Sequence, residues 1–146
     1  MNGRRYLLPC LFSHRPISVV VLALGCNDLK QRHNLDPCDI SAGLEILVAD
    51  IERSSAGPES SRPRLVIISP PACKETAQAV KWGFRGCAPK SVATIAAFRE
   101  VAMAAGAQYV DLSAVAAVGE DGIHFGAEAA GPIGEAVASA VRTALG

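Results

Sequence analysis

The clearest hydrophobic pattern in the chain is the aliphatic run over residues 17–24, Ile-Ser-Val-Val-Val-Leu-Ala-Leu. It lacks the polar alternation of a half-exposed strand and is typical of a parallel strand buried on both faces. The run ends at Gly25, and two short polar side chains, Asn27 and Asp28, follow it. Parallel strands point their carboxyl ends at the crevice where open α/β sheets bind ligands, so Asn27 is a candidate amide donor there. A strand followed by an ordinary Asx turn explains the same residues.

Two further apolar runs, at residues 65–68 and 109–110, predict short strands. A helix beginning near Pro37 is expected between the first two strands, because apolar residues recur there at helical spacing: Ile40, Leu44, Leu47, Val48 and Ile51. A strand, a helix and a strand in this order form a βαβ unit with parallel neighbouring strands.

Two more helices are expected in the second half of the chain. One starts at Pro89 or Lys90 and runs to about Ala105, before Gly106. The other is the last element of the chain, and Pro132 should kink it or mark its beginning. The alternation of strands and helices predicts an α/β fold with three parallel strands in chain order and helices on both faces.

Two segments carry weaker patterns. Residues 1–16 are expected to form a short helical turn and a loop, because Pro9 disfavours a long helix. Residues 72–88 have no clean periodicity and place Trp82 and Phe84 among glycines and lysines. They predict either a loop or broken helix at the mouth of a pocket, or a surface loop held by the two aromatic rings.

Composition restricts the class of protein. The length of 146 residues fits one domain over residues 1–146, and the balance of 14 basic against 14 acidic residues disfavours nucleic acid and anionic membranes as partners. No run reaches the roughly 20 apolar residues of a membrane span. The five cysteines are odd in number and lack metal-ligand spacing, so we expect a reduced cytoplasmic protein with no metal site.

An exported lipoprotein is an alternative, because Ala23-Leu24-Gly25-Cys26 is somewhat like a lipoprotein cleavage box after Arg4 and Arg5. Residues 14–16, His-Arg-Pro, interrupt the apolar segment that an export signal requires, and therefore disfavour this alternative.

A second polar motif precedes the last helix. Asp121 and His124 are three positions apart, with Gly122 between them. A carboxylate can orient an imidazole and stabilise its charged form while the imidazole acts as a general base. The alternative is a loop Asp that caps a turn beside a half-exposed His.

The two motifs together resemble the SGNH (GDSL) hydrolase family. Gly25-Cys26-Asn27-Asp28 looks like the third conserved block of that family, and Asp121-Gly122-Ile123-His124-Phe125, about 90 residues later, looks like the fifth. Residues 2–11, 14–16, 27–30 and 69–71 and the helix from Lys90 are similar to its bacterial arylesterase and acyltransferase branch, so the resemblance covers essentially the whole chain.

The resemblance implies a flavodoxin-like three-layer α/β/α sandwich and the hydrolysis of small esters without cofactor or metal. It implies that His124 is the general base, that Asp121 orients it, and that Asn27 donates to the oxyanion. Gly25 would keep the end of the strand compact, and homo-oligomers are common in this branch.

The sequence departs from the family at the nucleophile. The family serine lies in a Gly-Asp-Ser block at the end of the first strand, and residues 1–146 contain neither that block nor the second one. We therefore expect a partial domain that lacks the first two strands and is weakly active or inactive. A non-catalytic binding module derived from the same fold is the alternative.

No residue of the chain is assigned as nucleophile. Six serines that could be nucleophiles by residue type all lie outside any Gly-Asp-Ser block: Ser13, Ser18, Ser41, Ser69, Ser91 and Ser113. Cys26 occupies the variable position of its motif and is expected to be a small buried side chain, with a replacement Cys-His pair as the alternative.

Overall fold

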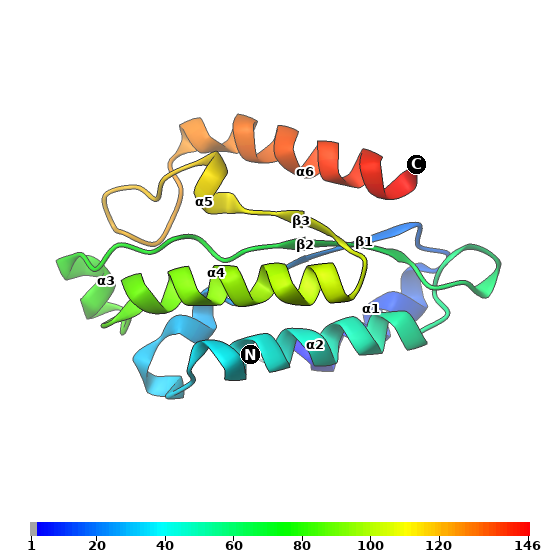
Figure 1. The fold of residues 1–146 in the computed structure, drawn as a ribbon, viewed down its shortest axis with the longest axis horizontal. Coiled ribbons are helices and arrows are strands. Elements are labelled where there is room, and N and C mark those ends of the chain that lie inside the picture. The colour runs from blue at the N-terminus through cyan, green and yellow to red at the C-terminus, as the bar shows by residue number, and fades with distance from the viewer. Residues whose placement is uncertain (1–2) are drawn as a thin grey trace.

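The computed structural model describes residues 3–146 and has a parallel β-sheet between layers of helices (Figure 1). The elements in chain order are α1 (Gly3–His14), β1 (Val19–Ala23), η1 (Cys26–Leu29), η2 (Gln31–His33), α2 (Pro37–Arg53), η3 (Pro58–Ser60), β2 (Arg64–Ile68), α3 (Ala77–Lys81), α4 (Cys87–Ala104), β3 (Gln108–Val110), α5 (Leu112–Val115), η4 (Ala127–Ala129) and α6 (Ala130–Leu145).

The sheet has the order β1-β2-β3, and both strand pairs are parallel. In the register, Val19 lies opposite Arg64 and Ala23 opposite Ile68, which in turn lies opposite Val110. The predicted strands, their order and their direction are therefore confirmed. The expected burial of the first strand on both faces is wrong, because β1 has a neighbouring strand on one side only within the described residues, and Val21 and Ala23 are exposed. The three carboxyl ends point to one edge, at the left of Figure 1, where α3 and the loop between α5 and α6 also lie.

Alternate residues of β2 pack into two different cores. Leu65 and Ile67 belong to the core that the sheet shares with α1, α2 and α4, and Val66 and Ile68 belong to the smaller core under α6. Figure 1 shows the same division, with α6 on one face of the sheet and α1, α2 and α4 on the other. A strand covered on both faces has no polar positions, which explains its continuous apolar run.

Local capping determines where α2 begins. The Asp36 side chain accepts hydrogen bonds from the backbone N–H groups of Cys38 and Asp39, and the Asp39 side chain accepts one from the N–H of Asp36. Pro37 at the first helical position lacks only an N–H that would have no partner in the helix. The predicted start of this helix is confirmed.

The N-terminal segment is a helix of 12 residues, α1, rather than the short turn expected from Pro9. Pro9 removes one helical hydrogen bond, but it lies on the exposed side of α1. Leu11 is 2% exposed, and Arg4 binds Asp50 of α2 at 2.6 Å between Nε and Oδ2. This packing against α2 stabilises α1 by more than Pro9 destabilises it.

The other helices refine the predictions. The helix expected from Pro89 or Lys90 starts at Cys87, because proline is tolerated in the first helical turn. The irregular segment contains the short helix α3, and α6 begins at Ala130, so Pro132 marks its beginning. Within residues 3–146, no helix is long and apolar enough to cross a membrane.

β1 forms one edge of the sheet within the described residues. It pairs with β2 on one side, and Val21 is 40% exposed. A flat hydrophobic edge offers unpaired N–H and C=O groups to any other strand, and it is a site of self-association.

We predict that the 146-residue chain self-associates or precipitates through β1 and that Val21→Lys reduces this, because a lysine disfavours strand addition at an edge. Sedimentation of both proteins over a range of concentrations measures the effect. Met103→Lys is the control, since Met103 is 75% exposed on α4. Association that Met103→Lys abolishes and Val21→Lys does not would place the contact on α4 instead.

Candidate active site

The turn after β1 carries the first candidate residue. Gly25 has φ +103°, and a Cβ there would lie 2.9 Å from Cζ of Phe98, a buried ring of α4. Glycine therefore lets the chain turn tightly against α4 and enter η1. Asn27, the second residue of η1, is exposed at the carboxyl edge of the sheet.

The second candidate pair lies in the loop before η4. One oxygen of Asp121, Oδ1, accepts the backbone N–H groups of Ile123 and His124, both at 2.8 Å. The other, Oδ2, lies 2.8 Å from Nδ1 of His124. The carboxylate thus forms the turn and orients the imidazole at the same time.

The electrostatics of the pair follow from these bonds. The N–H groups of His124 and Ile123, with the imidazole, lower the pKa of Asp121 from 3.8 to about 2. An ionised carboxylate can only accept, so Nδ1 of His124 is the donor and Nε2 is left as the acceptor in the neutral ring. That tautomer is the one a general base requires.

The surroundings of His124 are open. Its side chain is 70% exposed, and the ring of Trp82 packs edge-on against it with centroids 5.6 Å apart. Phe84, by contrast, is 4% exposed in the core, with Lys30 Nζ 5.0 Å from its ring centre. Of the two aromatic residues in the irregular segment, Trp82 therefore lies beside the candidate site.

Contacts from the segment after β2 hold the Asp121 turn in place. The Gly122 carbonyl accepts the N–H of Lys74 at 2.8 Å, and the Asp121 carbonyl accepts the Thr76 hydroxyl at 2.7 Å. Gly122 has φ +82°, and a Cβ there would overlap the Lys74 carbonyl oxygen. Sequence reasoning missed Thr76 and Lys74, because their role depends on a contact across the fold that no local pattern indicates.

The two motifs meet on the same edge. Trp82, whose ring packs against His124, is followed in the chain by Gly83. The Gln31 N–H bonds the carbonyl of Gly83 at 2.9 Å, beside Trp82. Asn27, Asp121 and His124 therefore lie on the same edge of the sheet.

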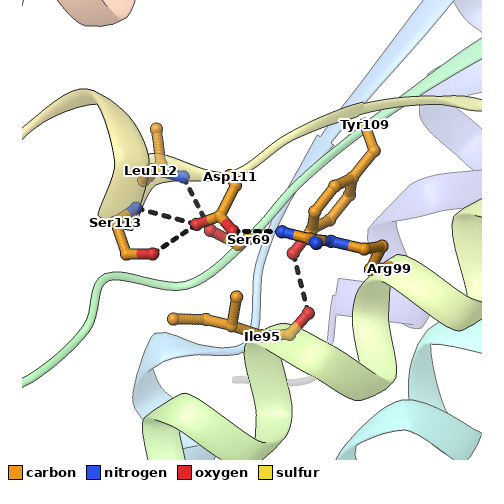
Figure 2. Close-up of polar contacts among 7 residues, drawn as sticks. All are labelled: Ser69, Ile95, Arg99, Tyr109, Asp111, Leu112 and Ser113. Atoms are coloured by element: carbon orange, nitrogen blue, oxygen red, sulfur yellow. Dashed lines mark hydrogen bonds and ion pairs between the residues drawn. The ribbon is translucent and has the colours of Figure 1, made fainter.

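A second polar network fixes the end of β3 (Figure 2). Asp111 Oδ2 binds Arg99 of α4 at 2.6 Å, and the Tyr109 hydroxyl donates to the Ile95 carbonyl at 2.8 Å. Ser69, 2% exposed, accepts the N–H of Leu112 at 2.9 Å. The network joins β2, β3 and α4 at the start of the segment that leads to Asp121.

The pKa of Asp111 reflects this network. Burial raises it, but the hydrogen bonds from Ser113 and Arg99 together outweigh burial and lower it overall. Asp111 is therefore a structural carboxylate in this network.

The buried serines have structural partners. Ser91, fully buried in α4, accepts the N–H of Cys73 at 3.0 Å and donates to the Ala88 carbonyl at 2.9 Å. Ser69 holds Leu112, as Figure 2 shows. Among the described residues, no three or more His, Cys, Asp or Glu side chains are grouped to hold a metal ion.

Comparison with solved structures identifies the class of protein. The chain is 30% identical to the M. smegmatis aryl esterase, with a TM-score of 0.88, and the match covers 99% of this chain and 69% of that one. The inhibitor-bound form of the aryl esterase matches with a TM-score of 0.90, at the same identity and coverage. A carbohydrate acetylesterase family member from Sinorhizobium meliloti is also 30% identical, with a TM-score of 0.88 over 98% of this chain and 68% of that one.

No family model and no curated protein matches the sequence, so the assignment depends on the solved structures. The fold, with its parallel sheet between helical layers, is that of these esterases. The chain belongs to the SGNH hydrolase family of esterases.

We predict that the Asp121 carboxylate stays ionised well below the ordinary range of an aspartate. Its lowered folded pKa, about 2, means that its stabilising contribution is complete above pH 3.8 and is lost as the pH falls through about 2. The amide ¹H shifts of Ile123 and His124 should therefore stay nearly constant down to about pH 3. A midpoint near 3.8 would contradict the bonding described, and Asp121→Asn is the control that removes the titration.

We also predict that Gly122→Ala destabilises the fold by at least about 2 kcal/mol, since it combines a positive φ with overlap on the Lys74 carbonyl. Gly134→Ala is the matched control, because Gly134 lies in the exposed interior of α6 with nothing within 4 Å of an added Cβ. It should gain about 0.5–1 kcal/mol. Urea denaturation of both variants measures the difference, and equal midpoints would disprove the close contact.

Proposed function

We propose that the carboxyl edge of the sheet holds the base and the oxyanion donor of an ester-hydrolase site. His124 is the general base, Asp121 orients it, and Asn27 donates to the oxyanion. The observation that carries the proposal is the bond of 2.8 Å between Asp121 Oδ2 and His124 Nδ1, on the edge that also carries Asn27. The substrates are small esters, in keeping with the aryl esterase and carbohydrate acetylesterase that the chain resembles.

The chemistry follows from these groups. Nε2 of His124 accepts the proton of an attacking hydroxyl, and the Asp121 carboxylate stabilises the imidazolium that forms. The amide of Asn27 donates a hydrogen bond to the oxygen that becomes negative in the tetrahedral intermediate. No step requires a metal or an organic cofactor.

The attacking hydroxyl is the component that residues 1–146 do not supply in a recognisable form. They contain no Gly-Asp-Ser block, and the buried Ser69 and Ser91 are hydrogen-bonded to the backbone. We propose that this 146-residue chain by itself hydrolyses esters weakly or not at all. The same absence favours a non-catalytic binding module as the second candidate function.

Two further proposals concern the cellular location and the oligomeric state of the protein. A reduced, cytoplasmic location is supported by the free thiols of all five cysteines: Cys10, Cys26, Cys38, Cys73 and Cys87. Assembly into homo-oligomers is supported by the open edge of β1.

We predict that the purified 146-residue chain shows little or no turnover of p-nitrophenyl acetate. An N-terminally extended version that carries a Gly-Asp-Ser block should gain activity, and His124→Ala in that version should lower kcat by roughly 1,000-fold or more. Initial rates of p-nitrophenol release measure both effects.

The controls separate the alternatives. Appreciable turnover by the unextended chain that His124→Ala abolishes would refute the proposal of low activity, and loss of that turnover in Cys26→Ser would identify a replacement nucleophile. An extended, folded version without turnover would favour the binding module. His33→Ala is the matched control, because His33 lies in the exposed η2 turn.

A further inference from the structure

The short helix α3 contacts the turn of Asp121 and His124 from both of its ends. Its N-cap residue, Thr76, donates its hydroxyl to the Asp121 carbonyl at 2.7 Å and accepts the N–H of Ala79 at 3.0 Å. Its C-cap residue, Trp82, packs its ring against the imidazole of His124, with centroids 5.6 Å apart and an interplanar angle of 71°. Figure 1 shows α3 at the same edge of the sheet as the loop that carries this turn. A single helix of five residues therefore contacts both members of the candidate pair.

The helix α3 is itself held firmly against the rest of the fold. Ala79 within it is 0% exposed and Phe84, just after it, is 4% exposed, and both belong to the main core. The Gly83 carbonyl accepts the N–H of Gln31 at 2.9 Å, which joins the end of α3 to η2. Groups that orient a functional side chain are effective when their own positions are locked by packing and hydrogen bonds. The ring of Trp82 meets that condition, because the backbone on both sides of it is anchored.

The imidazole of His124 needs more than its bond to Asp121 to keep one orientation. Its side chain is 70% exposed, and the hydrogen bond at Nδ1 fixes the position of that atom without fixing the plane of the ring. Trp82 supplies a second contact, at a centroid distance within the range of favourable aromatic pairs. Trp82 remains 41% exposed, so the contact with His124 is made at the surface rather than inside the core. The two contacts together define both the position and the plane of the imidazole.

We propose that Trp82 and Thr76 are positioning residues for His124. Trp82 fixes the plane of the imidazole, and Thr76 holds α3 against the Asp121 turn, so that Nδ1 stays on the carboxylate and Nε2 stays available as the acceptor. A displacement of about 1 Å in a catalytic group can lower a rate by roughly 100-fold, so the orientation of this ring matters for catalysis. The role in catalysis rests on the proposed function, whereas the ring contact can be measured without any ester turnover.

The test uses the fluorescence of Trp82, the one tryptophan of the 146-residue chain. A protonated imidazole quenches an indole ring that it contacts more strongly than a neutral imidazole does. We therefore expect a step in the emission across the pH range in which histidines titrate. His124→Gln should abolish the step, and the matched variants His14→Gln and His33→Gln, also at exposed positions, should retain it. A step that survives in His124→Gln, or no step in the unaltered chain, would overturn the proposal.

Conservative variants test each positioning residue separately. Thr76→Val removes the hydroxyl but keeps the shape and should lose most of the step, whereas Thr76→Ser should keep it. In NMR spectra, Trp82→Ala should move the ring signals of His124 to those of an unstructured histidine, and Trp82→Phe should restore most of the difference. Lys81→Ala, at the neighbouring exposed position of α3, is the control and should change neither measurement. Equal steps in the two Thr76 variants, or unchanged His124 signals in Trp82→Ala, would contradict the assigned roles.

Failure of this proposal and failure of the proposed function give different results. In the N-terminally extended version, Trp82→Ala should lower kcat by up to roughly 100-fold with little change in KM, because Trp82 acts through His124. An active extended version that Trp82→Ala leaves unchanged would overturn the positioning role alone. An inactive extended version, with the fluorescence step present in the 146-residue chain, would overturn the proposed function and retain the ring contact. The histidine variants decide whether the contact exists even if Thr76→Val does not fold.

Discussion

β2 is the strand on which the other elements depend. Within residues 3–146 it has a strand on each edge and helices on each face, and the four residues Leu65–Ile68 are all buried. Backbone groups in such a place must be paired in the sheet, so the position of β2 allows little variation. The segment after it, residues 69–76, makes the contacts to α4 and to the Asp121 turn. The candidate site is built around the end of this strand.

Much of the fold follows from local patterns. β2 could be predicted because burial on both faces requires uninterrupted apolar residues, and the start of α2 because Asp36 and Pro37 satisfy its first turn locally. The length of α1 could not, because Pro9 opposes it locally and the favourable terms, burial of Leu11 and the pair between Arg4 and Asp50, come from α2. Such contacts lie far apart in the sequence and leave no periodic pattern.

The candidate site also has some residues that the sequence predicts and others that only the folded structure identifies. Asp121 and His124 could be proposed from spacing, because a carboxylate three residues before a histidine reaches both the backbone N–H groups of the turn and the ring. The hydrogen bonds of Lys74 and Thr76 to the same turn could not, since they lie more than 40 residues away in the chain. Gly122 is required both by the local turn and by the contact across the fold. Its φ of +82° suits the turn, and its missing Cβ leaves room for the Lys74 carbonyl. The local motif therefore needs the contact across the fold to keep its geometry.

The solvent exposure of His124 limits what the candidate site can do chemically. With 70% of its side chain exposed, water screens the attraction between the imidazolium and Asp121, and the pair can stabilise a transition state only weakly. β1 is unpaired on one side within the described residues, and its end leads to Cys26 and Asn27. A parallel strand added beside β1 would bring its own carboxyl end to this same edge, because parallel strands all end on one side of a sheet. A hydroxyl placed there would lie on the edge that carries His124. A strand that completes the sheet beside β1 would therefore also reach the edge that carries the candidate site.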